Sequence, residues 1–328
     1  MFIVRLVQMA AVVLVAGAFA FRVLVVPSEA VQSDHEGNEL DRWLWRCCAW
    51  GIPLALLSWV FWFALVAMDM SGRALSLEVI RTVLSQTTFG QLWELRSGLL
   101  LLLAAHLFVW HRQGTNSPRL AVAGATLAAA LLMSLPWAGH AVGTAPPWRA
   151  VHVATDAAHL LGAGLWLGAL VPLVLVWHAA AKNDTHAWHA VAVLATQRFS
   201  SLGVAAVTAL ALTGFINAWF LVGGFAALVD TDYGRLVMSK VALFVVIVAI
   251  AAFNRFKLRP RLSVAETRDG SARSTLVALR RNALVELCLG VAILVVVANL
   301  GLTPPSAHGR EHEHEHMDGH SHHHSSHH

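Results

Sequence analysis

The sequence predicts an all-α integral membrane protein that forms a bundle of eight transmembrane helices. Hydrophobic residues make up 57% of the chain and charged residues only 13%, which is about half the charged fraction of a soluble domain. The mean hydropathy is correspondingly high, at +0.62. The apolar residues fall into eight runs, each long enough for an α-helix to cross a bilayer. We therefore expect eight spans, at residues 2–26, 44–68, 92–112, 119–137, 152–178, 198–222, 235–254 and 281–302.

The first run, residues 2–26, has some features of a secretory signal peptide. It is too long for one, however, and its Ala18-Phe19-Ala20 motif is followed by more apolar chain instead of a polar mature start. We expect this run to be kept as the first transmembrane helix.

Polar segments separate the later runs. The second run ends at the sequence MDM (residues 68–70), and the fourth is followed by the loop AGHAVGTAPP (residues 138–147). The seventh and eighth runs are separated by a long basic loop that includes residues 261–280. None of these segments is apolar enough to remain in hydrocarbon. They therefore separate one predicted span from the next.

The orientation follows from the basic residues in the connections. The seventh connection is the most basic, with eight Lys and Arg residues: Arg255, Lys257, Arg259, Arg261, Arg268, Arg273, Arg280 and Arg281. Cytoplasmic loops are enriched in Lys and Arg. Placing this connection in the cytoplasm puts both termini on the periplasmic side of the membrane.

The chain divides into a membrane domain at residues 1–305 and a histidine-rich tail at residues 306–328. The tail mixes histidine with acidic residues, cannot form an apolar core, and is typical of a disordered metal-binding segment. A cloning tag is the alternative interpretation, although the histidines do not form one uninterrupted block. The histidines that we expect to capture metal are His308, His312, His314, His316, His320, His322, His323 and His324.

The fifth run contains the clearest candidate site. Its polar residues His152, Asp156 and His159 have the spacing i, i+4 and i+7, which places them on one face of a helix. Such side chains are costly in hydrocarbon unless they are paired, ligated or exposed to water. We expect a metal or proton site, with hydrogen bonds to backbone carbonyls as the alternative. Gly164 and Gly168 form a small-xxx-small pattern, which predicts close packing against another helix.

Further candidate ligands lie at the same predicted end of the bundle: His140, Met68, Met70, Met133 and Met238. Imidazole suits Cu(II), Zn(II) or Ni(II), whereas thioether sulfur suits Cu(I). A site that draws on both favours copper. Since His152 and His159 are about 10 Å apart along a helix, we do not expect both to bind the same ion.

Other polar residues within the spans are candidates for a transport path or for structural contacts: Asn217, Tyr233, Lys240 and Glu286. Glu286 needs a partner, and we expect Arg198 or Arg255 to form a structural ion pair with it. A proton or ion relay is the alternative role of this carboxylate.

Several function classes lack support in the sequence. There is no P-loop, dinucleotide fingerprint or nucleophile elbow, so we do not expect an enzyme. The basic pI does not indicate nucleic-acid binding, because the basic residues lie in short loops beside membrane lipid. Cys47, Cys48 and Cys288 have neither a zinc spacing nor a disulfide framework. Haem between His106 and His159 is a minor possibility, because their predicted depths in the membrane differ.

The sequence resembles the CopD family of bacterial copper-resistance membrane proteins. The resemblance rests on the GHAVG loop, on DAAHLLGAGLWLG, and on a long C-terminal part that includes YGRLVMSK, FNRFKLRPRL and LRRNALVELCLGVAILVVVANLG. It implies a bacterial inner-membrane protein that carries copper from periplasm to cytoplasm, with a small periplasmic copper carrier, CopC, as partner. The polar positions that match the family pattern are His140, Asp156, His159, Tyr233, Lys240 and Glu286.

Three functions remain open at this point. Copper transport for homeostasis and resistance is the first, and it needs polar residues through the middle of the membrane. Delivery of copper to exported or membrane enzymes is the second, and it would use the same outer site without an inner exit. A haem-binding membrane electron carrier is the third.

Overall fold

The computed structural model describes residues 1–27, 31, 34–113, 117–183, 185–222, 224–265 and 271–303, and the predicted histidine-rich tail lies outside them. Within these ranges the regular secondary structure is helical, without a β-strand. Eight segments are long and apolar enough to cross a membrane, as predicted: Phe2–Val25, His35–Ser71, Thr88–Gln113, Pro118–Ala138, Arg149–Asn183, His186–Val222, Asp232–Leu262 and Ala272–Leu300.

Several helices extend beyond the predicted apolar runs. The second span was expected at residues 44–68 and the sixth at 198–222, but their helices cover Asp34–Ser71 and His186–Val222. Polar residues at a helix end can lie outside the hydrocarbon while the backbone remains helical. Hydropathy therefore locates the buried middle of each helix better than its ends.

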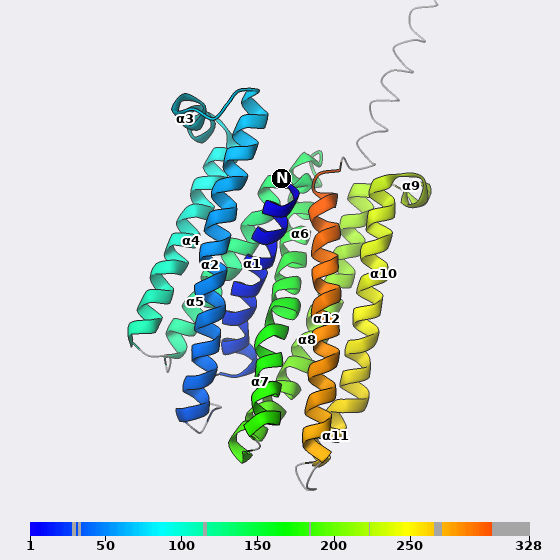
Figure 1. Cartoon of the computed structure of the whole chain (residues 1–328). Helices are drawn as coiled ribbons and strands as arrows, with labels where there is room; N and C mark the ends of the chain where they lie inside the picture. The colour runs from blue at the N-terminus through cyan, green and yellow to red at the C-terminus, as the bar shows by residue number, and fades with distance from the viewer. Residues whose placement is uncertain are drawn as a thin grey trace, which may run out of the picture.

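In the first half of the chain, helices α1 to α5 form four spans (Figure 1). Their bounds are α1 Phe2–Ala20, α2 Asp34–Ser71, α3 Leu77–Gln86, α4 Thr88–Gln113 and α5 Pro118–Ser134. A π-helical turn, Phe21–Val25, continues α1, and two short 3₁₀ helices, Leu135–Ala138 and His140–Gly143, follow α5.

The second half contains the other four spans. Their helices are α6 Arg149–Ala163, α7 Ala169–Asn183, α8 His186–Val222, α9 Phe225–Asp230, α10 Asp232–Phe253, α11 Arg259–Ala265 and α12 Ser271–Leu300. The π-helical segment Gly164–Gly168 joins α6 to α7, and a second one, Asn254–Leu258, joins α10 to α11.

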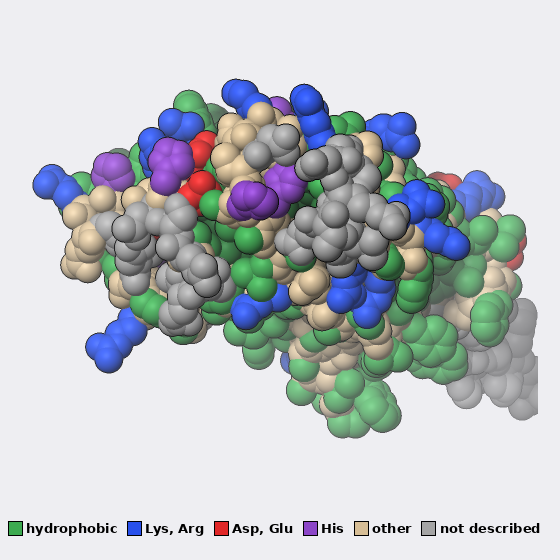
Figure 2. All heavy atoms as spheres, turned by 90° about the horizontal axis from the view of Figure 1, so that it is seen from below, with side chains coloured by type: hydrophobic (Ala, Val, Ile, Leu, Met, Phe, Trp, Pro, Cys, Tyr) green, Lys and Arg blue, Asp and Glu red, His purple; other side chains and the backbone are tan. Residues whose placement is uncertain are grey.

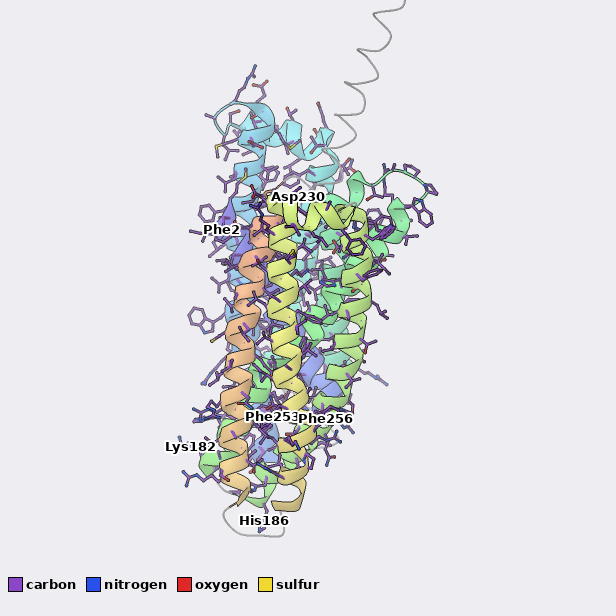
Figure 3. The ribbon with its side chains drawn as sticks, turned by 90° about the vertical axis from the view of Figure 1, so that its right-hand side faces the viewer. Phe2, Lys182, His186, Asp230, Phe253 and Phe256 are labelled. Carbon is purple, nitrogen blue, oxygen red and sulfur yellow. The ribbon has the colours of Figure 1, made fainter. Side chains whose placement is uncertain are left out.

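The two ends of the bundle differ in composition. Phe2, Asp230 and the end of α12 lie at one end, which we call the N-terminal end (Figures 1 and 3). Lys182 and His186 lie at the opposite end, which we call the basic end (Figure 3). Seen along the bundle axis, the basic end carries many Lys, Arg and His side chains (Figure 2).

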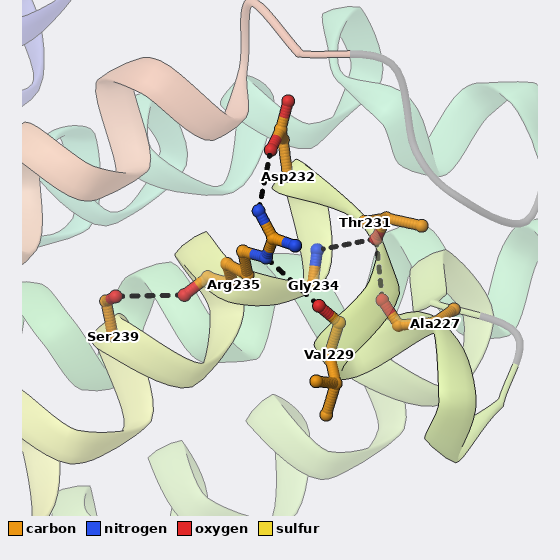
Figure 4. Close-up of polar contacts among 7 residues, drawn as sticks. All are labelled: Ala227, Val229, Thr231, Asp232, Gly234, Arg235 and Ser239. Carbon is orange, nitrogen blue, oxygen red and sulfur yellow. Dashed lines mark hydrogen bonds and ion pairs between the residues drawn. The ribbon is translucent and has the colours of Figure 1, made fainter.

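Helices α3 and α9 are short and do not follow from the apolar runs. Both lie at the N-terminal end (Figure 1). Thr231 joins α9 to α10, because its hydroxyl donates to the Ala227 carbonyl at 2.6 Å and accepts from the Gly234 amide at 3.0 Å (Figure 4). Threonine is a favourable N-cap for this reason. Arg235 adds a bond to the Val229 carbonyl at 3.0 Å, so the corner that starts α10 is firmly held.

The centre of the bundle depends on the predicted glycine contact. Gly168 faces Gly17 of α1 so closely that a Cβ atom at either position would overlap the other backbone. Gly164 lies against Leu132 and Ala16. Small residues allow helix backbones to approach closely in membranes. The pattern is therefore confirmed as a packing contact between α1 and the segment that joins α6 to α7.

A single hydrogen bond connects the two ends of the described chain. The Arg5 guanidinium, on α1, donates to the carbonyl of Gly301 at the end of α12, over 2.8 Å. This bond places the first and last spans side by side at the N-terminal end.

Candidate cation site in the helix bundle

Polar side chains from three helices contact one another toward the N-terminal end of the bundle. Helix α6 provides Asp156 and His159, α8 provides Thr213 and Asn217, and α10 provides Lys240. His159 lies ten residues into α6 and Lys240 eight residues into α10, which corresponds to similar depths of about 12–15 Å. These residues form what we call the polar cluster.

The hydrogen bonds of His159 determine which ring nitrogen carries the proton. The Thr213 hydroxyl lies 2.6 Å from the Ala209 carbonyl, to which it donates, and 2.9 Å from His159 Nδ1. Because its hydrogen is used by the carbonyl, the hydroxyl accepts from Nδ1–H. Lys240 Nζ lies 3.2 Å from His159 Nε2 and can only donate. His159 is therefore neutral, and its Nε2 lone pair points at the Lys240 ammonium.

Asp156 and Asn217 provide oxygen atoms beside this pair. Asn217 Nδ2 donates to Asp156 Oδ1 at 3.1 Å, and this bond fixes the orientation of the amide. Its other atom, Oδ1, is buried and has no hydrogen-bond partner among the described residues. Lys240 and Arg5 are both within electrostatic range of the Asp156 carboxylate. A carboxylate, an unpaired amide oxygen and an imidazole nitrogen are together a donor set for a cation.

Lys240 occupies the space beside His159 Nε2. The described residues contain no group of three or more His, Cys, Asp or Glu side chains arranged to hold a metal. At His159 the Nε2 lone pair is already engaged by the ammonium. A metal ion can bind this nitrogen only after Lys240 moves away.

His152 lies apart from the polar cluster. It is 1% exposed, with its Nδ1 2.7 Å from the Thr144 hydroxyl and its ring stacked on Phe220 at 4.7 Å. It is two helical turns from His159, or about 10 Å along the axis. The two histidines thus have separate surroundings, and the expectation that they do not bind the same ion stays a prediction. The backbone of His140 lies in the short 3₁₀ helix that packs on α6.

The predicted methionine ligands lie on different helices and do not line the polar cluster. Met68 is half-buried and Met70 is exposed on α2, whereas Met133 is exposed on α5 and Met238 on α10. The side chains of Met70, Met133 and Met238 are on the outer surface of the bundle. Any role for them in binding copper therefore stays a prediction.

A second polar group lies toward the basic end. Glu286 of α12 is 2% exposed, and its Oε1 accepts from Asn254 Nδ2 at 2.7 Å. The expected partner was Arg198 or Arg255, but Arg255 instead donates to the Ser200 hydroxyl at 2.6 Å. A neutral amide satisfies the carboxyl oxygen in place of an ion pair. Tyr233 is buried at the N-terminal end, where it packs against apolar residues and lies within electrostatic range of Asp156 and Arg5.

A cavity of about 210 Å³ lies beside Glu286, between α7, α8, α10 and α12. Its lining includes Trp166. The ring of Trp166 meets the Phe244 ring edge-on, with 6.0 Å between the two ring centroids. Trp166 is seven residues beyond His159, or about 10 Å along the helical rise. Two aromatic rings therefore lie between the polar cluster and the cavity.

Two members of the site could not be found from residue type alone. Arg5 is one of two arginines inside the first apolar run, and nothing in that run indicates a contact with the fifth span. Thr213 is a common residue in a membrane helix, where its hydroxyl usually bonds the preceding turn. The order of the helices around the bundle, which the sequence pattern does not specify, brings both residues to Asp156 and His159.

Comparisons with known proteins cover most of the chain. A family model described as Copper resistance protein D matches residues 193–300, and Copper resistance protein D-like, N-terminal domain, matches residues 1–149. Asn217 and Lys240 fall inside the first range, whereas Asp156 and His159 lie between the two.

Two curated relatives are also similar over most of their length. Copper resistance protein D of Pseudomonas syringae pv. tomato is 31% identical over 258 residues, 77% of this chain and 81% of that protein. Inner membrane protein YebZ of Escherichia coli (strain K12) is 30% identical over 220 residues, 67% of this chain and 70% of that protein. No solved structure matches the chain significantly.

Proposed function

This chain belongs to the copper resistance protein D family, and from that premise we propose that it carries copper across the bacterial inner membrane for copper homeostasis and resistance. The direction that we propose is from periplasm to cytoplasm. The excess of Lys and Arg at the basic end supports a cytoplasmic location for that end. The name of one relative, an inner membrane protein, supports the choice of membrane.

The main support for this proposal is the polar cluster. It combines the His159 imidazole, the Asp156 carboxylate and the unpaired Asn217 oxygen inside a membrane bundle. Placing polar groups at such a depth costs free energy, and in membrane proteins such groups mark ion pathways. Imidazole nitrogen and carboxylate oxygen are suitable ligands for Cu(II).

Lys240 gives this site a way to exchange cations. The ammonium holds the Nε2 lone pair of His159 near the Asp156 carboxylate while copper is absent. Arriving copper displaces the ammonium, and the returning ammonium favours release of the metal. The site thus holds either the ammonium or copper, and a cation always lies near the Asp156 carboxylate.

The remaining parts of the chain have proposed roles in supply and exit. The histidine-rich tail captures copper outside the membrane, and a periplasmic copper carrier of the CopC type delivers it. On the other side, the buried Glu286 carboxyl is a polar step toward the basic end. Movement of Trp166 relative to Phe244 would connect the polar cluster with Glu286.

Delivery of copper to an exported or membrane enzyme is the second candidate. The packing of Trp166 against Phe244 favours it, because these rings separate the polar cluster from the cavity beside Glu286. Haem binding gains little support, because His106 packs against Phe19 and Gly124 and not beside the polar cluster.

Copper uptake by proteoliposomes distinguishes transport from delivery. Full-length protein should accumulate copper, and His159→Ala should reduce uptake at least about tenfold because a proposed ligand is lost. The matched control is His106→Ala, which removes another histidine from inside the bundle and should leave uptake near the wild-type rate.

Copper binding should be measured separately on protein truncated after Pro305, because the tail would dominate the signal. Binding that depends on His159 without any uptake would favour delivery. Uptake that persists in His159→Ala would overturn the assignment of the polar cluster.

A further inference from the structure

We infer that the cavity between α8 and α10 is a binding site for an anionic phospholipid, with an acyl chain inside it and the phosphate at Arg255 and Arg259. Both arginines belong to the residues that line the cavity of about 210 Å³. This site lies outside the polar cluster, and the inference does not depend on copper transport.

The cavity opens on the membrane-facing surface of the bundle. Two of its lining residues, Val204 of α8 and Phe256 after α10, are 48% and 70% exposed. A Cβ atom built on Gly203, which also lines the cavity, would meet nothing within 4 Å. The space is therefore accessible from the side, where lipid surrounds the protein.

The wall that a ligand would meet is mainly apolar. The lining includes Trp166, Leu170, Val207 and Val248. Its main polar groups bond one another or the backbone: Thr196 to Ala192 at 2.6 Å, and Asn254 to Glu286 at 2.7 Å. A sugar or a hydrated ion would gain few hydrogen bonds there, whereas a hydrocarbon chain is compatible with this wall.

The two arginines lie at the depth of lipid headgroups. Arg255 is 23 residues beyond Asp232, the first residue of α10, which corresponds to about 35 Å of helix. The hydrocarbon core is about 30 Å thick, so Arg255 and Arg259 lie at its edge on the basic side. Phe253 and Phe256 lie at the same end of the bundle (Figure 3).

Charge complementarity identifies the headgroup. Arg255 uses one nitrogen, Nη1, for both of its bonds to Ser200. These bonds hold the guanidinium in place and leave its other nitrogens for an anion. Arginine binds phosphate well because of its planar, forked set of donors, and basic pockets between transmembrane helices on the cytoplasmic side recognise anionic lipid headgroups.

Native mass spectrometry of the full-length protein with added phosphatidylglycerol or phosphatidylcholine tests the site. The wild type should retain phosphatidylglycerol preferentially. Arg255→Gln combined with Arg259→Gln should weaken this retention roughly tenfold or more, because two charge-assisted contacts are lost. The matched control, Arg280→Gln with Arg281→Gln, removes two charges from the same end outside the cavity and should bind like wild type.

A second pair of variants tests the acyl chain. Ala252→Phe fills the cavity and should reduce phosphatidylglycerol retention, whereas Ala249→Phe lies on the exposed face of α10 and should not. Glycerol phosphate, which has the phosphate without a chain, should not compete. Equal losses in the cavity and control variants, or equal binding of both lipids, would overturn the inference.

Discussion

At the scale of single residues, Lys240 has the clearest consequence. Its ammonium donates to a histidine nitrogen whose lone pair is also the best metal ligand in the polar cluster. The cluster is therefore arranged around a cation, the Lys240 ammonium. In the proposed function, the balance between the Lys240 ammonium and copper determines both how tightly copper binds and how readily it leaves.

Substitution of Lys240 by Met should increase copper affinity. The change removes a competing charged hydrogen bond, which is worth roughly 1.5–3 kcal/mol, so we expect binding roughly 10–100-fold tighter in protein truncated after Pro305. Copper uptake should fall at the same time, because nothing displaces the bound metal. Lys240→Arg, which keeps the charge, is the control. Weaker binding in Lys240→Met would mean that the lysine supports the site in another way.

At the scale of helices, the contact between α1 and the Gly164–Gly168 segment holds the candidate site in place. Gly17 and Gly168 allow the two backbones to touch, and the neighbouring turn carries Trp166. Short π-helical segments occur frequently at functional sites. Here the segment directly follows the helix that carries Asp156 and His159.

Adding a methyl group at this contact should destabilise the bundle. Gly17→Ala or Gly168→Ala would drive a Cβ atom into the opposing backbone, and overpacking of this kind costs roughly 1–3 kcal/mol. Thermal unfolding in detergent should show a lower midpoint for both variants. Gly98→Ala is the control, because its Cβ atom would meet nothing within 4 Å. It should be neutral or slightly stabilising, since alanine favours helix over glycine.

Much of this architecture could be predicted from the sequence, and the site only in part. The eight spans follow from apolar runs because a bilayer imposes a minimum length on each helix. His152, Asp156 and His159 follow from helical spacing. Their partners do not, since Arg5, Thr213 and Asn217 come from spans that no local pattern connects to the fifth. The partner of Glu286 was wrongly expected to be an arginine, because residue spacing does not distinguish Asn254 from its neighbour Arg255.

At the scale of the whole molecule, the two ends of the bundle should face different compartments. The connection near Arg73 lies at one end, and Lys182 lies at the basic end. By the positive-inside rule, we expect the basic end to lie in the cytoplasm. This orientation determines which way the proposed copper path runs.

Cysteine labelling checks the orientation. In a background without Cys47, Cys48 and Cys288, an impermeant maleimide should label Arg73→Cys from the periplasmic side. Lys182→Cys should react only after the inner membrane is permeabilised. The reverse pattern would invert the topology and, with it, the proposed direction of transport.

The bond from Arg5 to the Gly301 carbonyl also constrains how the chain assembles. Its two partners are separated by 296 positions, so the first span enters the membrane long before Gly301 is synthesised. During that interval its guanidinium has no access to this acceptor. Asp156 is also within electrostatic range of Arg5. It is synthesised about halfway through translation and can stabilise the Arg5 charge until Gly301 is present. The contact between Arg5 and Gly301 therefore forms only after the eighth helix has docked beside the first.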